Sequence, residues 1–250
     1  MKKVSKLSRA KTGKTGTGII VMAYNEEKNL GPALDGLLRE VPKVTDDFEI
    51  LVIDDGSDDS TGNVADKYGR KSRHIRVVHH RENRGFGRSF RSGVSLTRKR
   101  YVVGFPGDND TSPASLAQLV RRANDRTVVT CYPTDLSNRS AFRHLISKSF
   151  VVLMNAVFRM NLKYFNGSFI YLTEAVKNLN LKSDGFAIYA EAKVRLRHLG
   201  YPFEEIPFIY TGRKHGTSKA VTGKSVRETL ETIITLVKDI YLKKRINYSN

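Results

Sequence analysis

The chain has 250 residues, 40% of them hydrophobic, which suits one large α/β domain or one domain with a short appendage and excludes a disordered chain. Its single cysteine, Cys131, excludes a disulfide framework and favours a reducing, cytoplasmic compartment. Forty-three Lys and Arg against 25 Asp and Glu give a net charge of +18, which attracts nucleic acid, anionic lipid or phosphorylated substrates without choosing among them.

Residues 1–17 carry six basic side chains and no acidic one, and they lack the apolar core of a signal sequence. We therefore expect a flexible basic arm. The best candidate for a membrane span, 150–158, is too short for one and contains Asn155.

Short β-rich runs alternate with helical patterns through the first half of the chain. This alternation predicts βαβ units and a mostly parallel α/β sheet flanked by helices. Strands are expected over 18–23, 48–53, 75–79, 101–105 and 127–131. Helices are expected over 27–40, from Ser60 or Thr61 to Tyr68, over 86–96, and from Pro113 to about Asn124.

The second half predicts a helix over 140–160, a strand over 165–172, a helix over 185–199 ended by Gly200, and a strand over 203–210. The last segment, 225–244, has apolar residues at helical spacing and is followed closely by Arg245. It predicts an amphipathic helix that lies on a membrane, packs on its own domain or forms an oligomer contact.

Three polar clusters follow predicted strands, at residues 23–27, 54–61 and 107–110. In open parallel sheets, ligands bind at the carboxyl ends of the strands, so all three clusters could face one crevice. Ionised Asp54 and Asp55 accept hydrogen bonds only, which suits base N–H and ribose hydroxyl groups; helix capping is the alternative use of these side chains.

The third cluster, Gly107-Asp108-Asn109-Asp110, has the clearest chemistry. Its two carboxylates can both reach one hard cation such as Mg²⁺ or Mn²⁺, and such an ion would neutralise a leaving diphosphate. The alternative is an Asx-turn that caps the helix starting near Pro113.

Two further features each allow two interpretations. The glycine-containing turn 83–87 leads into a helix and either lets the backbone approach a ligand or simply makes a tight turn. Asp184 suits either the N-cap of the following helix or a general base for a hydroxyl acceptor.

The order of AYNEEKNL, DDGSDDST, NRGFGRSFRSG and GDND resembles the family-2 glycosyltransferases of the GT-A (Rossmann-like) fold. The later strings 186–191, 205–207 and 213–219 resemble the branch of dolichyl-phosphate mannose synthases and bacterial polyprenyl-phosphate sugar transferases. This resemblance covers about residues 18–222. It implies a nucleotide-sugar half over 18–135, an acceptor half over 136–222 and a C-terminal amphipathic helix within 223–250.

The resemblance also implies roles at matching positions. The residues that it implies for nucleotide binding are Ala23, Tyr24, Glu26, Asp54, Asp55, Gly56, Asp108 and Asn109. It implies that Asp108 and Asp110 bind the metal and that Asp110, Arg213 and Lys219 act in catalysis. It implies that Arg143, Ser147 and Ser218 bind the acceptor phosphate. An Arg fork and a Lys point charge both suit phosphate oxygens, although an exposed basic loop is the alternative for 213–219.

The chain departs from its relatives at three places. Ser112 stands where a glutamine can complete the metal site, and Tyr132-Pro133 stand where an Arg often follows the fifth strand. Ser168 replaces the Asp of a Gly-Asp-Phe string, so a carboxylate base there is not expected. A phosphate acceptor is already ionised near pH 7 and does not need a strong base.

These observations favour an inverting, metal-dependent glycosyltransferase of the hexosyltransferase type. We expect it to use Mg²⁺ or Mn²⁺ and to move a sugar from a UDP- or GDP-linked donor to a polyprenyl (dolichyl or undecaprenyl) phosphate. Its expected location is cytoplasmic and peripheral, on an anionic membrane surface or a separate membrane protein, with a homo-oligomer left open. The alternative is a soluble sugar or glycan acceptor.

Nucleic acid is not an expected partner, because no recognition motif appears and the acidic clusters would have no use. A nucleotidyltransferase usually has a Gly-rich loop with Arg and Lys near the first strand, which residues 24–27 do not resemble.

Overall fold

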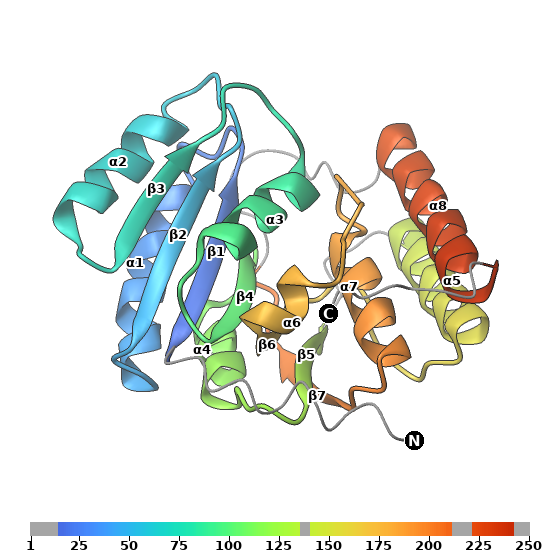
Figure 1. Ribbon diagram of the computed structural model, residues 1–250. Helices are drawn as coiled ribbons and strands as arrows, with labels where there is room; N and C mark the ends of the chain where they lie inside the picture. Colours follow the sequence, from blue (N-terminus) through green and yellow to red (C-terminus); the bar gives the residue numbers. More distant parts are fainter. Residues whose placement is uncertain (1–14, 136–140, 212–221, 243–250) are drawn as a thin grey trace.

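The computed structural model describes residues 15–135, 141–211 and 222–242. Its centre is a seven-stranded sheet in the order β3-β2-β1-β4-β6-β5-β7. The strands are β1 Thr17–Ala23, β2 Phe48–Asp54, β3 Ile75–His79, β4 Tyr101–Pro106, β5 Val128–Pro133, β6 Phe169–Leu172 and β7 Phe203–Phe208. Only β6 runs against its neighbours, β4 and β5; all other pairs in this sheet are parallel (Figure 1). The expected mostly parallel α/β sheet flanked by helices is confirmed.

Helices cover both faces of the sheet, because its central strands are apolar on both sides and must be buried twice. The helices are α1 Leu30–Glu40, α2 Thr61–Lys71, α3 Phe86–Leu96, α4 Pro113–Arg121, α5 Ala141–Phe158, α6 Thr173–Lys177, α7 Ile188–His198 and α8 Gly223–Val237. Helices α1, α2 and α4 share one core with the sheet, and α3, α6 and α7 share the other.

A third apolar cluster lies beside the sheet, where α5, α7 and α8 meet (Figure 1). Leu236 of α8 is fully buried in it, next to Met154 and Phe158 of α5. A π-helical turn, η3 Lys238–Leu242, continues α8, and its Tyr241 donates a hydrogen bond to the carbonyl of Val157. One face of the C-terminal helix therefore packs on its own domain.

Most expected elements are present, with shifted ends. The strand expected from residue 165 begins only at Phe169, because residues 164–168 form a loop and do not pair with the sheet. The short helix α6 was not expected. The helix after Asp184 begins at Ile188 with Ala187 at its N-cap, so the alternative that Asp184 caps this helix is wrong. Gly200 ends this helix with a φ of 89°, as its position predicted. Thr17, placed in the basic arm, already belongs to β1, and the arm over 1–14 lies outside the described residues.

Candidate active site

The three polar clusters meet at one edge of the sheet. Strands β2, β1 and β4 are adjacent and parallel, and their last residues are in register, with Ala23 opposite Asp54 and Met22 opposite Pro106. The amide of Asp55 donates to the carbonyl of Ala23 at 2.9 Å, and the amide of Gly107 donates to the carbonyl of Met22 at 2.8 Å. The sequence prediction that the clusters face the same edge is confirmed.

The first two clusters are tied to each other by side chains. The amide of Asn25 donates to Ser57 Oγ at 3.0 Å, and the amide of Asp58 donates back to Asn25 Oδ1 at 2.9 Å. The amide of Glu26 donates to Thr61 Oγ1 at 2.7 Å, and the buried Glu26 carboxylate accepts from Asn29 Nδ2 at 2.7 Å. Because Asn29 is the N-cap residue of α1, Glu26 fixes the entry to that helix.

The Asp54 carboxylate is buried and oriented by two donors. It accepts from the amide of Ser57 at 3.2 Å and lies 2.9 Å from His79 Nδ1. The hydrogen bond with Asp54 is the chief cause that raises the pKa of His79, and Asp66, 3.1 Å from the other ring nitrogen, adds to it against the opposing effect of burial. The two groups thus hold each other at the paired ends of β2 and β3.

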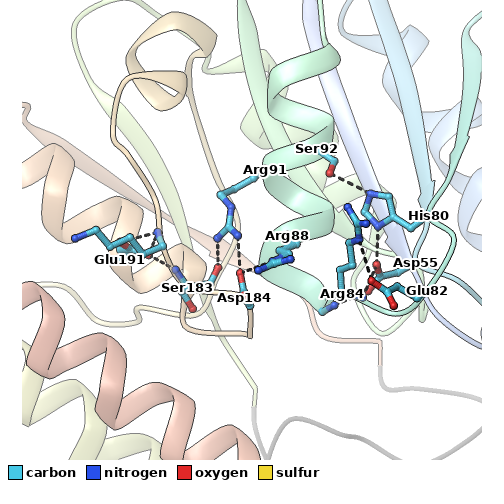
Figure 2. A network of polar contacts seen from close by, with 12 residues as sticks. Asp55, His80, Glu82, Arg84, Arg88, Arg91, Ser92, Ser183, Asp184 and Glu191 are labelled. Carbon is cyan, nitrogen blue, oxygen red and sulfur yellow. Dashed lines mark hydrogen bonds and ion pairs between the residues drawn. The ribbon is translucent and has the colours of Figure 1, made fainter. Parts of the chain in front are cut away.

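The Asp55 carboxylate, also buried, organises the segment after β3. It lies 2.7 Å from His80 Nδ1 and accepts from the amides of Arg84 at 3.1 Å and Gly85 at 2.8 Å. His80 Nε2 in turn lies 3.0 Å from Ser92 Oγ on α3. Figure 2 shows His80 and Arg84 gathered around Asp55. Asp55 therefore shapes the loop 80–85 beside the predicted nucleotide site.

The glycines of the turn 83–87 let the chain approach itself. Gly85 has a φ of 92°, and a Cβ on it would come within 2.5 Å of the Asp184 carbonyl oxygen. A Cβ on Gly87 would come within 2.8 Å of the Asp184 carbonyl carbon, and the Gly87 amide donates to the Asp184 carbonyl at 2.8 Å. The start of α3 thus packs directly on residues 183–184, which precede α7.

Asp184 lies between two arginines of α3. Arg88 Nε is 3.1 Å from its Oδ1, and Arg91 donates to the same oxygen and to the carbonyl of Ser183 (Figure 2). Burial alone would raise the pKa of Asp184, but the hydrogen bonds from Arg91 and Arg88 outweigh it and lower that pKa. A carboxylate held by two guanidinium groups is a weak base, so the geometry disfavours Asp184 as the general base.

The Asp-Asn-Asp cluster forms a tight turn after β4. Asn109 has a φ of 56°, the amide of Asp110 donates to Asp108 Oδ1 at 3.3 Å, and Thr111 Oγ1 donates to Asp110 Oδ1 at 3.0 Å. Helix α4 is capped by Ser112 and not by either aspartate, since Ser112 Oγ accepts from the amide of Ser115. Ser112, which stands where the resemblance would place a glutamine, is therefore a helix cap.

The chemistry of this donor set suits a hard divalent cation. Two carboxylates from one turn can share an ion that takes its other ligands from water and substrate phosphates, as Mg²⁺ and Mn²⁺ commonly do. Among the residues that the structure describes, no group of three or more His, Cys, Asp or Glu is arranged to hold a metal by itself. The turn thus fits an ion shared with a substrate and not an all-protein cage.

The expected acceptor-phosphate residues are described only in part. Ser147 lies half-buried on α5. Arg143 belongs to the first turn of the same helix, but its side chain lies outside the described part of the structure. Arg213, Ser218 and Lys219 also lie outside the described residues, so their roles remain predictions.

Sequence reasoning missed a buried ionic network and a buried lysine on α7. Arg195 pairs with Glu191 one helical turn earlier at 2.8 Å and with Asp239 of η3 at 3.0 Å, and Glu191 accepts from the amides of Lys182 and Ser183. The i,i+4 spacing of Glu191 and Arg195 was a visible signal for the first pair. Lys193 had no such signal, because its partners are backbone carbonyls of a distant loop.

Comparison with known proteins identifies relatives of this arrangement. A family model, "Glycosyl transferase family 2", matches residues 18–179. The "Polyprenol monophosphomannose synthase" of Mycolicibacterium smegmatis is 25% identical over 227 residues, which cover 86% of this chain and 84% of that protein. The "Uncharacterized glycosyltransferase EpsJ" of Bacillus subtilis is 32% identical over 115 residues, which cover 45% of this chain but only 32% of the relative's length; the same fraction of EpsH from that organism is matched.

Solved structures share the fold. Glucosyl-3-phosphoglycerate synthase from Mycobacterium tuberculosis, in complex with Mn²⁺, UDP-glucose and phosphoglyceric acid, has a TM-score of 0.68 and 16% sequence identity, with 90% of this chain and 80% of that chain covered. The same enzyme is also known with Mg²⁺ and UDP, at a TM-score of 0.69.

Proposed function

The chain belongs to glycosyl transferase family 2, and on that premise we propose that it transfers a sugar from a UDP- or GDP-linked donor to a polyprenyl phosphate at the cytoplasmic face of a membrane. The donor class follows the UDP and UDP-glucose of the structural relatives, and the acceptor class follows the polyprenol monophosphomannose synthase. The gathering of Asp54, Asp55, Asp108 and Asp110 at one sheet edge supports a nucleotide-sugar site there.

Exposed apolar side chains on α5 and on α8 are the observation that supports a lipid acceptor. Leu145, Val152 and Leu153 on α5 and Val226, Leu230 and Ile234 on α8 are between 44% and 67% exposed. These two helices lie side by side in Figure 1, and α5 carries the predicted acceptor residues Arg143 and Ser147. An apolar surface of this kind can lie in the interfacial region of a bilayer. No described helix is both long and apolar enough to cross one.

The mechanism that we propose relies on positioning and electrostatics. Asp108 and Asp110 would hold Mg²⁺ or Mn²⁺, which when bound neutralises the charge of the departing diphosphate. The buried Asp54 and Asp55 hold the loops that surround the nucleotide in fixed positions. An ionised phosphate acceptor needs no strong base, which agrees with Ser168 at the position of the missing carboxylate and with the lowered pKa of Asp184. One displacement at the anomeric carbon would invert its configuration.

A soluble acceptor is the second candidate. The structural relatives bind phosphoglyceric acid, a soluble acid that also carries a phosphate. In that case the phosphate recognition would remain and the exposed face of α5 and α8 would serve another contact.

The deciding experiment is a transfer assay with radiolabelled UDP- and GDP-sugars, Mg²⁺ or Mn²⁺, and short-chain polyprenyl phosphate in detergent. We expect label to enter the organic phase, to be lost with EDTA, and to fall at least 100-fold in Asp110→Asn. Asp46→Asn is the matched control, since Asp46 is exposed and precedes β2 at the opposite edge of the sheet. Label found only in water-soluble product with phosphoglyceric acid would replace the lipid acceptor by the soluble one.

A further inference from the structure

Lys193 is a lysine that the interior of the protein would not normally tolerate. It lies on α7 with none of its side chain exposed, and among the described residues it forms no ion pair with a carboxylate. Burial lowers the pKa of its ammonium to about 8. Burying such a charge costs on the order of several kcal/mol, and hydrogen bonds to the ammonium must compensate this cost. A hydrophobic residue would fill this place more cheaply, so the ammonium has a specific use.

The ammonium is held by backbone carbonyls. Lys193 Nζ donates to the carbonyl of Gly167 at 2.7 Å, to that of Phe165 at 2.9 Å and to that of Tyr164 at 3.4 Å. These three residues belong to the loop 164–168, which precedes β6 and most of which was expected to be part of that strand. One side chain from α7 thus fixes the path of a whole loop.

The loop 164–168 forms one wall of a recess at the ligand-binding edge of the sheet. The recess has a volume of about 40 Å³. Its other walls include Pro106, Pro133 and Phe208, the last residues of β4, β5 and β7, and Thr111, which directly follows the predicted metal ligand Asp110. The wall formed by Asn166, Gly167 and Ser168 therefore lies across this recess from the turn that carries the predicted metal ligands.

The carbonyl contacts also determine what the other side of this wall offers. All described peptide bonds are trans, and in a trans peptide the N–H points away from the C=O. With the carbonyls of Phe165 and Gly167 directed at the ammonium, the amides of Asn166 and Ser168 are directed away from it. A cation behind a peptide polarises it and makes its N–H a stronger donor. Polarised backbone donors bind an anion more strongly than a neutral hydroxyl.

We propose that Lys193 is a positioning residue for the acceptor: its ammonium fixes the loop 164–168 and directs two polarised amides, those of Asn166 and Ser168, towards a phosphate-bearing acceptor. This inference rests on the proposed glycosyl transfer at this edge of the sheet, but it holds for a lipid phosphate and for a soluble phosphate alike. The loop would thus offer a backbone amide at position 168, where this chain has a serine and not a carboxylate.

The test compares Lys193→Met, which keeps the side-chain volume but removes charge and donors, with Lys193→Gln, which keeps one donor group. Lys177→Met is the matched control, because Lys177 donates to the carbonyl of Thr97 next to the start of β4, far from the recess. We expect Lys193→Met to raise the acceptor KM about tenfold or more, the effect of roughly one charge-assisted hydrogen bond. The donor KM and the dissociation constant of UDP or GDP should stay within twofold of wild type, and Lys193→Gln should lie between.

Two outcomes would overturn the proposal: an acceptor KM that stays within twofold in Lys193→Met, or acceptor and donor constants that worsen together, as a general loss of packing would give. If the wild-type protein transfers to phosphoglyceric acid and not to lipid, the lipid acceptor fails, while the same change in acceptor KM still supports Lys193. Amide hydrogen exchange of the peptide covering 164–168 provides a readout that needs no activity. Faster exchange in Lys193→Met but not in Lys177→Met supports the role, and unchanged exchange contradicts it.

Discussion

Buried carboxylates at the end of β2 each bind protein groups before any ligand arrives. Asp55 accepts from two backbone amides and lies in hydrogen-bond distance of His80, so it fixes the loop after β3. Asp54 does the same for the turn at Ser57. Their expected contacts with base and ribose stay a prediction, but the geometry shows that both act first on the shape of the site.

We expect Asp55→Asn to weaken both nucleotide binding and the fold. An amide cannot accept from His80, Arg84 and Gly85 as a carboxylate does, and the lost charge-assisted bonds should cost about 1–3 kcal/mol. Calorimetric titration with UDP and GDP and urea unfolding measure the two effects. Asp58→Asn, in the same cluster but exposed, should change the stability little; equal losses in both variants would contradict the role of Asp55.

His79 gives the fold a pH dependence. Its pKa is raised in the folded protein, chiefly by Asp54, so the protonated imidazole stabilises the fold. This stabilisation is complete below the unfolded pKa of about 6.5 and is lost as the pH rises through the folded value. The melting temperature should therefore fall more in the wild type than in His79→Gln as the pH is raised from about 5 to about 8, a range that spans the titration of histidine. The exposed His198→Gln should behave as the wild type, and parallel curves for all three would refute the linkage.

At the scale of elements, α3 connects the loop after β3 with the segment that precedes α7. Its first turn has glycines where it meets residues 183–184, and its arginines Arg88 and Arg91 hold Asp184. The contact explains the two closely spaced glycines, since a side chain at either position would strike the backbone at 183–184.

We expect Gly87→Ala to destabilise the protein by about 1–3 kcal/mol, because the new methyl group overlaps the backbone at Asp184. Gly31→Ala in α1 is the control: its Cβ would lie 3.5 Å from the nearest atom, Tyr68 Oη, and alanine favours a helix. Chemical denaturation measures both. Similar behaviour of the two variants would show that close packing at α3 does not limit stability.

Hydrophobic periodicity predicted the sheet and its main helices, because strands such as β1 and helices such as α1 are defined by local pattern. The turn Asp108–Asp110 and the shared edge also followed from the sequence, since topology brings strand ends together. Contacts between distant segments did not follow. The ion pairs of Asp184 with Arg88 and Arg91, and the hydrogen bonds of Lys193 to backbone carbonyls, join residues more than 20 positions apart. No local spacing in the sequence predicts them.

At the scale of the whole molecule, the C-terminal helix is attached by charge on one side and exposed on the other. Asp239, following α8, binds both Arg195 and Lys182, and Arg195 is 3% exposed. We expect Asp239→Asn to cost about 1–3 kcal/mol, because a neutral amide replaces the carboxylate that pairs with a buried guanidinium. Limited proteolysis should then cut in 223–242 sooner than in the wild type. Arg227→Gln, which loses only an exposed pair with Glu231, should resist as the wild type does.

The outer face of the same helix tests the membrane assignment. Leu230 and Ile234 are 51% and 53% exposed and lie one turn apart, so their replacement by serine removes apolar surface without opening the core. If this face lies on lipid, Leu230→Ser with Ile234→Ser should lower binding to anionic vesicles about tenfold or more in a flotation assay, because each buried side chain contributes roughly 1.5–3 kcal/mol. Leu96→Ser on α3 removes a leucine of similar exposure, 42%, from another surface and should float as the wild type does. Unchanged flotation in the double variant, together with intact transfer to lipid phosphate in detergent, would mean that the face of α5 and α8 serves a protein contact and that the enzyme reaches its lipid by another surface.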